Sequence, residues 1–142
     1  MKSQSLVLVE PRLFLVLPVE PKPKSRPKVF RTKSGDTFTI TPGDKVHTEN
    51  MIRDRLMETE VKFPAGTPIK LDVTFYLARP KSKPKRVELP ATRPDLDQYV
   101  KLAMDAMSKY VYPDDAAVTT LVARKRYGSP PRIELEMSVD VP

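Results

Sequence analysis

The stretch "IKLDVTFYL", residues 69–77, alternates apolar and polar side chains along its whole length. Alternation with a period of two is typical of a β-strand that buries one face and leaves the other toward solvent. We therefore predict a strand over 69–77, around which the other elements are placed.

Four further segments predict strands. They are rich in β-branched and apolar residues and are bounded by proline, glycine and serine. They are "RLFLVLPVE" (12–20), the hairpin "VFRTKSGDTFTI" (29–40), "AAVTTLVARKRY" (116–127) and "RIELEMSV" (132–139). Residues 128–131 form the turn between the last two.

Two segments predict helices. Residues 41–60 have a candidate cap at Thr41 or Asp44 and an inner stripe of Ile52 and Leu56. Residues 97–110 follow the next strand. Their expected buried stripe is Tyr99 or Val100, Ala103, Met107 and Tyr110, and their expected outer face is Asp97, Lys101 and Asp105. The order predicts one α+β domain over 1–142, with two helices laid on a small mixed sheet and with 1–11 as an extension.

The composition excludes several kinds of chemistry. The 142 residues contain no cysteine, so disulfides, zinc–thiolate sites, iron–sulfur clusters and thiol catalysis are ruled out. The one histidine, His47, is better explained by a structural or solvent-facing role than by catalysis. The apolar run 13–17 is too short to span a membrane, and no signal-peptide pattern follows it. We expect a soluble, cytoplasmic protein.

Positive charge dominates the chain. The formal net charge is +7 and the sequence pI is about 9.7, which fits a polyanionic partner and a merely basic surface equally well. Seventeen of the 25 lysines and arginines lie within 12–33, 79–93 and 124–132, and this clustering favours the polyanionic partner. The candidate DNA contacts are Lys22, Lys24, Arg26, Lys28, Arg79, Lys81, Lys83, Lys85, Arg86, Arg93 and Lys125. Many of them lie in the long loop 78–94, and a loop of that length is usually functional or mobile.

Negative charge is concentrated in one place. Five of the ten aspartates fall within "RPDLDQYVKLAMDAMSKYVYPDDAAV", residues 93–118. Capping explains an aspartate at a helix start, and a turn explains another. Neither explains a second pair at the far end of the same unit. A helix over 97–108 is about 18 Å long. Residues 109–115 can stretch about 23 Å, so the chain can run back and bring Asp115 near Asp95 and Asp97.

Such a cluster of carboxylates predicts a hard cation. Mg²⁺ takes oxygen ligands, commonly one or two carboxylates plus phosphate oxygen. Lys101 either neutralises charge and touches phosphate or forms an ordinary salt bridge with Asp97 or Asp105. A metal site within a basic surface suits phosphodiester hydrolysis. Two alternatives stay open. One is a nucleic-acid-binding protein without catalysis, and the other is a metal nuclease that acts on other branched or single-stranded DNA.

The same stretch resembles the signature of the RusA family of Holliday-junction resolvases, found in bacteria, phages and prophages. The matching residues are Arg93-Pro94-Asp95-Leu96-Asp97, Lys101, Asp105-Ala106-Met107, Tyr112 and Asp114-Asp115-Ala116-Ala117-Val118. "PKPKSRPKVF", "FYLARP" and Lys125 with Tyr127 are compatible with that family, so the resemblance covers about 12–140. Two positions depart from the family pattern. The family usually has Asn where this chain has Gln98, and it often has Gln where this chain has Ala117.

The resemblance implies a homodimer with one Mg²⁺-dependent site in each subunit. The two sites would cut opposing strands of a four-way DNA junction. The family's catalytic aspartates correspond to Asp95, Asp97 and Asp115, which would also hold the metal, and its catalytic lysine corresponds to Lys101. Asp114 and Gln98 are secondary candidates.

Overall fold

The computed structural model describes residues 12–22, 28–40, 43–108 and 110–142. Its strands are β1 (Arg12–Leu17), β2 (Lys28–Arg31), β3 (Thr37–Ile40), β4 (Ile69–Leu77), β5 (Val118–Tyr127) and β6 (Arg132–Val139). Its helices are α2 (Gly43–Glu58), α3 (Leu96–Met107) and the short 3₁₀ helix η1 (Asp115–Ala117). The predicted extension 1–11, the candidate cap Thr41, Lys24 and Arg26 lie outside the described residues.

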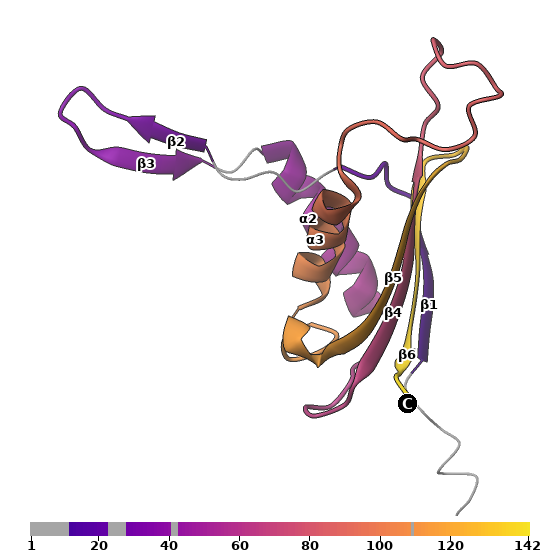
Figure 1. Cartoon of the computed structure of the whole chain (residues 1–142). Coiled ribbons are helices and arrows are strands. Elements are labelled where there is room, and N and C mark those ends of the chain that lie inside the picture. Colours follow the sequence, from indigo (N-terminus) through magenta and orange to yellow (C-terminus); the bar gives the residue numbers. More distant parts are fainter. Residues whose placement is uncertain (1–11, 23–27, 41–42, 109) are drawn as a thin grey trace, which may run out of the picture.

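Four strands form one mixed sheet in the order β1-β6-β4-β5 (Figure 1). The strand β4 has the predicted bounds and lies inside the sheet, antiparallel to β6 and parallel to β5. A short turn joins β5 to β6, but β4 lies between them. The predicted hairpin is confirmed as the antiparallel pair β2–β3, which extends away from the sheet in Figure 1.

One face of the sheet carries the core. The alternate residues of β4, from Ile69 to Phe75, are fully buried. On the neighbouring strand β6, Ile133, Leu135 and Met137 are buried in the same way. Both helices lie on this side of the sheet (Figure 1). Burying each large side chain contributes roughly 1.5–3 kcal/mol, so the alternation that predicts the strand also holds the helices on it. The predicted α+β architecture is confirmed.

The helix α3 covers the sheet with an apolar face. Its buried residues are Tyr99, Leu102, Ala103, Ala106 and Met107. Tyr110 was expected in this stripe, and that prediction is wrong, since its side chain is 39% exposed. The reason is the helix end. Ser108 has φ −59° and ψ 134°, so the helix stops at Met107 and Tyr110 no longer shares its face.

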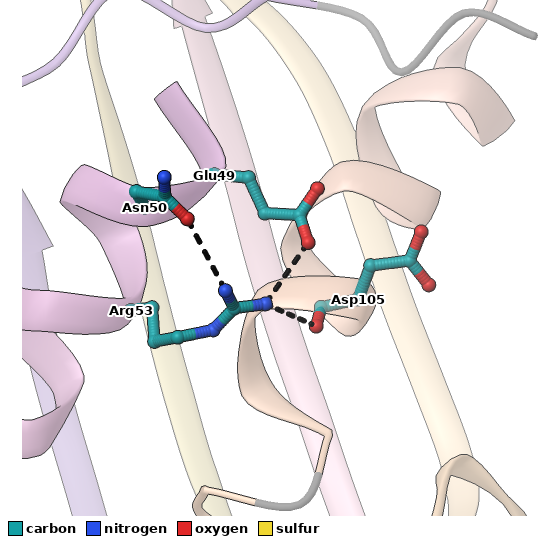
Figure 2. Close-up of polar contacts among 4 residues, drawn as sticks. All are labelled: Glu49, Asn50, Arg53 and Asp105. Carbon is teal, nitrogen blue, oxygen red and sulfur yellow. Dashed lines mark hydrogen bonds and ion pairs between the residues drawn. The ribbon is translucent and has the colours of Figure 1, made fainter. Parts of the chain in front are cut away.

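Arg53 on α2 ties the two helices together (Figure 2). Its guanidinium donates to the Asn50 side chain (3.2 Å), to Glu49 (3.0 Å) and to the backbone carbonyl of Asp105 on α3 (3.4 Å). The same guanidinium lies 4.7 Å from the centre of the Tyr110 ring. These contacts fix α2 beside the C-terminal half of α3.

No helix among the described residues is both long enough and apolar enough to cross a membrane.

Candidate active site

The N-terminus of α3 presents two carboxylates to solvent. Asp95 is the N-cap residue by backbone conformation (φ −69°, ψ 147°), but its side chain makes no capping hydrogen bond. The first turn is closed instead by the backbone, where the Gln98 N–H donates to the Asp95 carbonyl at 3.1 Å. Asp97 is also exposed. The helix dipole favours negative charge here, yet capping does not account for the Asp95 carboxylate.

Lys101 lies one turn after Asp97, and both side chains are exposed on the same helix face. Within the described residues, Lys101 pairs neither with Asp97 nor with Asp105. The ordinary salt-bridge explanation of this lysine is therefore not realised. Gln98 is exposed beside the same carboxylates.

A buried tyrosine holds the third aspartate. Asp115 begins η1, and the Tyr112 hydroxyl donates to its Oδ1 at 2.8 Å. The Tyr112 side chain is 2% exposed. Burial, followed by the hydrogen bond and charge of Asp115 and the charges of Asp105 and Asp114, raises the pKa of Tyr112 well above its ordinary value. The tyrosine therefore remains a donor and leaves the second oxygen of Asp115 available.

Asp114 has a different role. Its carboxylate accepts a hydrogen bond from the Ala116 N–H at 3.2 Å and caps η1. The capping explanation that fails for Asp95 therefore holds for Asp114.

The three candidate aspartates do not converge within one chain. After α3 the backbone stays at the C-terminal end of the helix, where the Phe63 N–H donates to the Val111 carbonyl at 2.7 Å. Val118, just after η1, pairs with Ile69 at the start of β4. The expectation that the chain runs back along α3 is wrong, because β5 starts at this end of the sheet.

The distance between the two ends follows from β5. Lys125 near the end of this strand binds the Pro94 carbonyl at 2.9 Å, next to Asp95. Val118 and Lys125 are seven residues apart along β5, which is about 23 Å at ~3.3 Å per residue. Accordingly, no group of three histidine, cysteine or acidic side chains among the described residues is placed to hold a metal ion.

Two of the candidate DNA contacts bind the protein itself. Lys125 Nζ donates to the carbonyls of Thr92 (2.8 Å) and Pro94 (2.9 Å). Arg79 donates to the carbonyls of Pro84 (2.9 Å) and Val87, and its guanidinium lies 4.7 Å from the centre of the Tyr127 ring. These two cations shape the loop 78–94 from within.

The other basic candidates have varied environments. Lys81, Lys85, Arg86 and Arg93 are exposed on the loop and Lys83 is half-buried. Lys22 lies 4.0 Å from Glu20. Lys28 begins β2. The free positive charge in the described residues near Asp95 therefore comes mainly from the middle of the loop.

Sequence reasoning did not identify the side chain that orients Asp115. The signals for Tyr112 were its place in the family signature and its spacing of three residues before an aspartate, which the structure turns into a direct hydrogen bond. The inward roles of Arg79 and Lys125 had no local signal, because their acceptors are backbone carbonyls that any sequence supplies.

Fold and site together define a class. This is an α+β protein with exposed carboxylates at a helix N-terminus, beside a loop rich in lysine and arginine. The family profile of "Endodeoxyribonuclease RusA" matches residues 18–138. The chain belongs to this family.

The chain is also similar to two curated proteins, and the name of the phage protein agrees with that assignment. Over 99 residues the chain is 35% identical to "Crossover junction endodeoxyribonuclease rusA" of Lactococcus phage r1t, covering 67% of this chain and 75% of the phage protein. Over 78 residues it is 37% identical to "Uncharacterized protein YqaN" of Bacillus subtilis (strain 168), covering 48% of this chain and 55% of the Bacillus protein. The chain thus spans about half the length of the Bacillus relative and three quarters of the phage relative.

Proposed function

We propose that this protein is a Mg²⁺-dependent endodeoxyribonuclease that resolves four-way DNA junctions by paired phosphodiester hydrolysis. The observation that carries the proposal is the state of Asp95 and Asp97. In a member of an endodeoxyribonuclease family, both are exposed at a helix N-terminus, and capping does not use the Asp95 carboxylate.

The acidic residues suit a hard divalent cation. Asp95, Asp97 and Asp115 offer carboxylate oxygens, the ligand type that Mg²⁺ prefers. Bound there, the ion would polarise a phosphate oxygen and lower the pKa of a water molecule. Since one chain holds these residues at two ends of α3, the fit requires a second chain.

The protein's own side chains supply the rest of the site. Lys101 follows Asp97 by one turn and faces solvent without an ion pair among the described residues, so its ammonium group is free to approach a phosphate oxygen. Tyr112 holds one oxygen of Asp115 at 2.8 Å and fixes the direction of the other. The exposed lysines and arginines within 81–93 would bind the DNA backbone.

A two-fold dimer resolves the separation of the carboxylates. If two α3 helices lie antiparallel across the axis, Asp115 of one protomer approaches Asp95 and Asp97 of the other. The symmetry then creates two equal sites at once. A four-way junction likewise presents two equivalent strands, so paired sites match paired cuts.

The direct test is cleavage. The protein is incubated with four-way junction, duplex and single-stranded DNA, with Mg²⁺ or with a chelator. We expect paired cuts in the junction only, lost with the chelator. Binding without cleavage would indicate a non-catalytic DNA-binding protein, and equal cleavage of all three would indicate a general nuclease.

The shared site has a sharper test. Asp97→Asn and Asp115→Asn subunits are each expected to be inactive as homodimers. A mixed dimer is predicted to regain one wild-type site, since both substitutions fall in the same composite site and leave the other intact. Dimers separated by two different affinity tags should therefore nick one strand of the junction. Sites built within single chains would leave this mixed dimer inactive.

A matched control makes the result quantitative. A mixed dimer of wild-type and Asp97→Asn subunits has one intact site under either arrangement. Its nicking rate sets the value that the Asp97→Asn with Asp115→Asn dimer should reach. Light scattering at the assay concentration establishes that both preparations are dimers.

A further inference from the structure

A cavity of about 200 Å³ lies beside the N-terminus of α3. Its walls come from five separate segments: the residues after β1, the end of β4, the loop before Asp95, α3 itself and the end of β5. The lining includes Pro80, Pro90 and Pro94 together with the rings of Tyr99 and Tyr127. Because Pro94 immediately precedes Asp95, the cavity adjoins the proposed active site.

The Tyr99 hydroxyl is the polar group of interest in this Tyr99 cavity. The residue is 3% exposed and its ring packs on Phe75, with ring centres 5.4 Å apart. Among the described residues the Tyr99 hydroxyl has no hydrogen-bond partner. Its oxygen is nevertheless not fully buried. The small accessible part of Tyr99 therefore includes its hydroxyl, at a residue that lines the cavity.

The cavity walls are braced. Lys125 holds the carbonyls of Thr92 and Pro94, and Arg79 covers the Tyr127 ring while binding the loop backbone at Pro84. These contacts join the loop to the sheet without occupying the hydroxyl of Tyr99. A preformed site of this kind loses little entropy when a rigid ligand enters.

We propose that the Tyr99 cavity receives one unstacked nucleobase of the DNA strand that is cut. The proline rings and the partly exposed Tyr127 offer apolar walls to a base, and the Tyr99 hydroxyl can donate to or accept from its polar edge. Enzymes that read an extruded base combine the same two elements. This inference rests on the proposed function and adds a base-reading subsite to it.

One carboxylate in the lining suits the polar edge of a base. Glu20 lies in the lining and carries a carboxylate, which repels phosphate but accepts from an exocyclic amino group. Arg93 also lines the cavity. It is exposed and lies two residues before Asp95. The phosphate backbone of the same DNA strand would then pass along the exposed lysines and arginines of the loop. One nucleobase of that strand would turn into the cavity.

Photocrosslinking tests the location. Asp97→Asn protein is bound to junctions that carry a single iodinated pyrimidine, uracil or cytosine, at each position within two nucleotides of the cut. We expect one position to crosslink to Tyr99 or Tyr127, identified by mass spectrometry of the peptides. A stable junction complex without crosslinks to either tyrosine overturns the inference. Failure to bind any junction overturns the proposed function itself.

Tyr99→Phe tests the hydroxyl while keeping the ring. We expect wild-type protein to prefer certain bases at the crosslinked position, and Tyr99→Phe to reduce that preference roughly fivefold, as one lost hydrogen bond implies. On a junction with an abasic site there, the variant should match the wild type. Equal slowing on natural and abasic junctions would indicate a merely structural role. Tyr110→Phe, at an exposed tyrosine outside the cavity, is the matched control.

Discussion

Adjacent aspartates in this protein have different tasks. Asp114 accepts a backbone N–H and caps η1, whereas Asp115 accepts the hydroxyl of a buried tyrosine. A backbone cap stabilises the turn, but a hydrogen bond from a fixed side chain selects one orientation of a carboxylate. This difference favours Asp115 over Asp114 as the member of the pair that takes part in the proposed site.

Tyr112→Phe should separate positioning from folding. The change keeps the buried ring and removes the donor to Asp115, so the carboxylate can rotate. We expect single-turnover junction cleavage to fall about tenfold while junction affinity stays unchanged, and stability to fall by about 1 kcal/mol. Gel-shift and cleavage assays measure the two effects, with Tyr76→Phe on the helix-free face of the sheet as the control. Loss of binding together with cleavage would contradict the positioning role.

The same tyrosine predicts an alkaline effect. Burial and the Asp115 hydrogen bond raise the pKa of Tyr112 in the folded state above the value of about 10 that it has in the unfolded chain. Its contribution to stability is therefore complete below about pH 10 and is lost as pH rises toward the folded pKa. Urea unfolding above pH 10 should show a shallower decline for Tyr112→Phe than for the wild type. An identical decline would contradict the assignment.

The loop 78–94 is organised as one element although it contains no helix or strand. Arg79 and Lys125 lie near the ends of the neighbouring strands β4 and β5, and each donates to two loop carbonyls. Lys125 binds the carbonyls of Thr92 and Pro94, which lie three residues and one residue before Asp95. A cation that looks like a phosphate contact in the sequence is thus a structural contact at the start of α3.

Lys125→Met and Lys85→Met form a matched pair. Lys125→Met keeps the aliphatic stem but removes both carbonyl contacts. We expect about tenfold slower cleavage, faster hydrogen exchange in 84–94 and an unchanged salt dependence of binding. Lys85→Met, at an exposed loop position, should lower the salt slope by about 0.9 and leave the rate at saturating protein unchanged. A reduced salt slope for Lys125→Met would instead make it a phosphate contact.

Local patterns in the sequence predict elements well and their arrangement poorly. Alternation placed β4 and β6 at their observed bounds, because one buried face requires that period. The position of β4 between β5 and β6 depends on pairing across distant segments, which no local pattern records. For the same reason the sequence indicated Asp95, Asp97 and Asp115 as a group, whereas the structure places Asp115 at the other end of α3.

At the scale of the whole molecule, some basic side chains are paired with carboxylates and others are not. On the helix-free face, Arg124 pairs with Asp72 at 2.7 Å and Arg132 pairs with Glu134 at 2.7 Å. Lys81, Lys85 and Arg86 on the loop form no ion pair with the described residues. The loop also lies beside Asp95 and Asp97, and we expect DNA to bind on this side.

The salt dependence of binding should distinguish these faces. Each phosphate contact that is lost lowers the slope of log affinity against log salt by about 0.9. Replacing Lys81, Lys85 and Arg86 with glutamine should therefore reduce the slope by about 2.7 if all three touch phosphate, equally for junctions of different sequence. Replacing Arg124 and Arg132 with glutamine should leave the slope nearly unchanged, because these arginines are already paired with carboxylates. The measurement is a fluorescence-anisotropy titration at several salt concentrations. It uses Asp97→Asn protein, because this substitution prevents cleavage during binding. A large slope change from the Arg124 and Arg132 replacements, with none from the loop, would place the DNA on the helix-free face and separate binding from the carboxylates of α3.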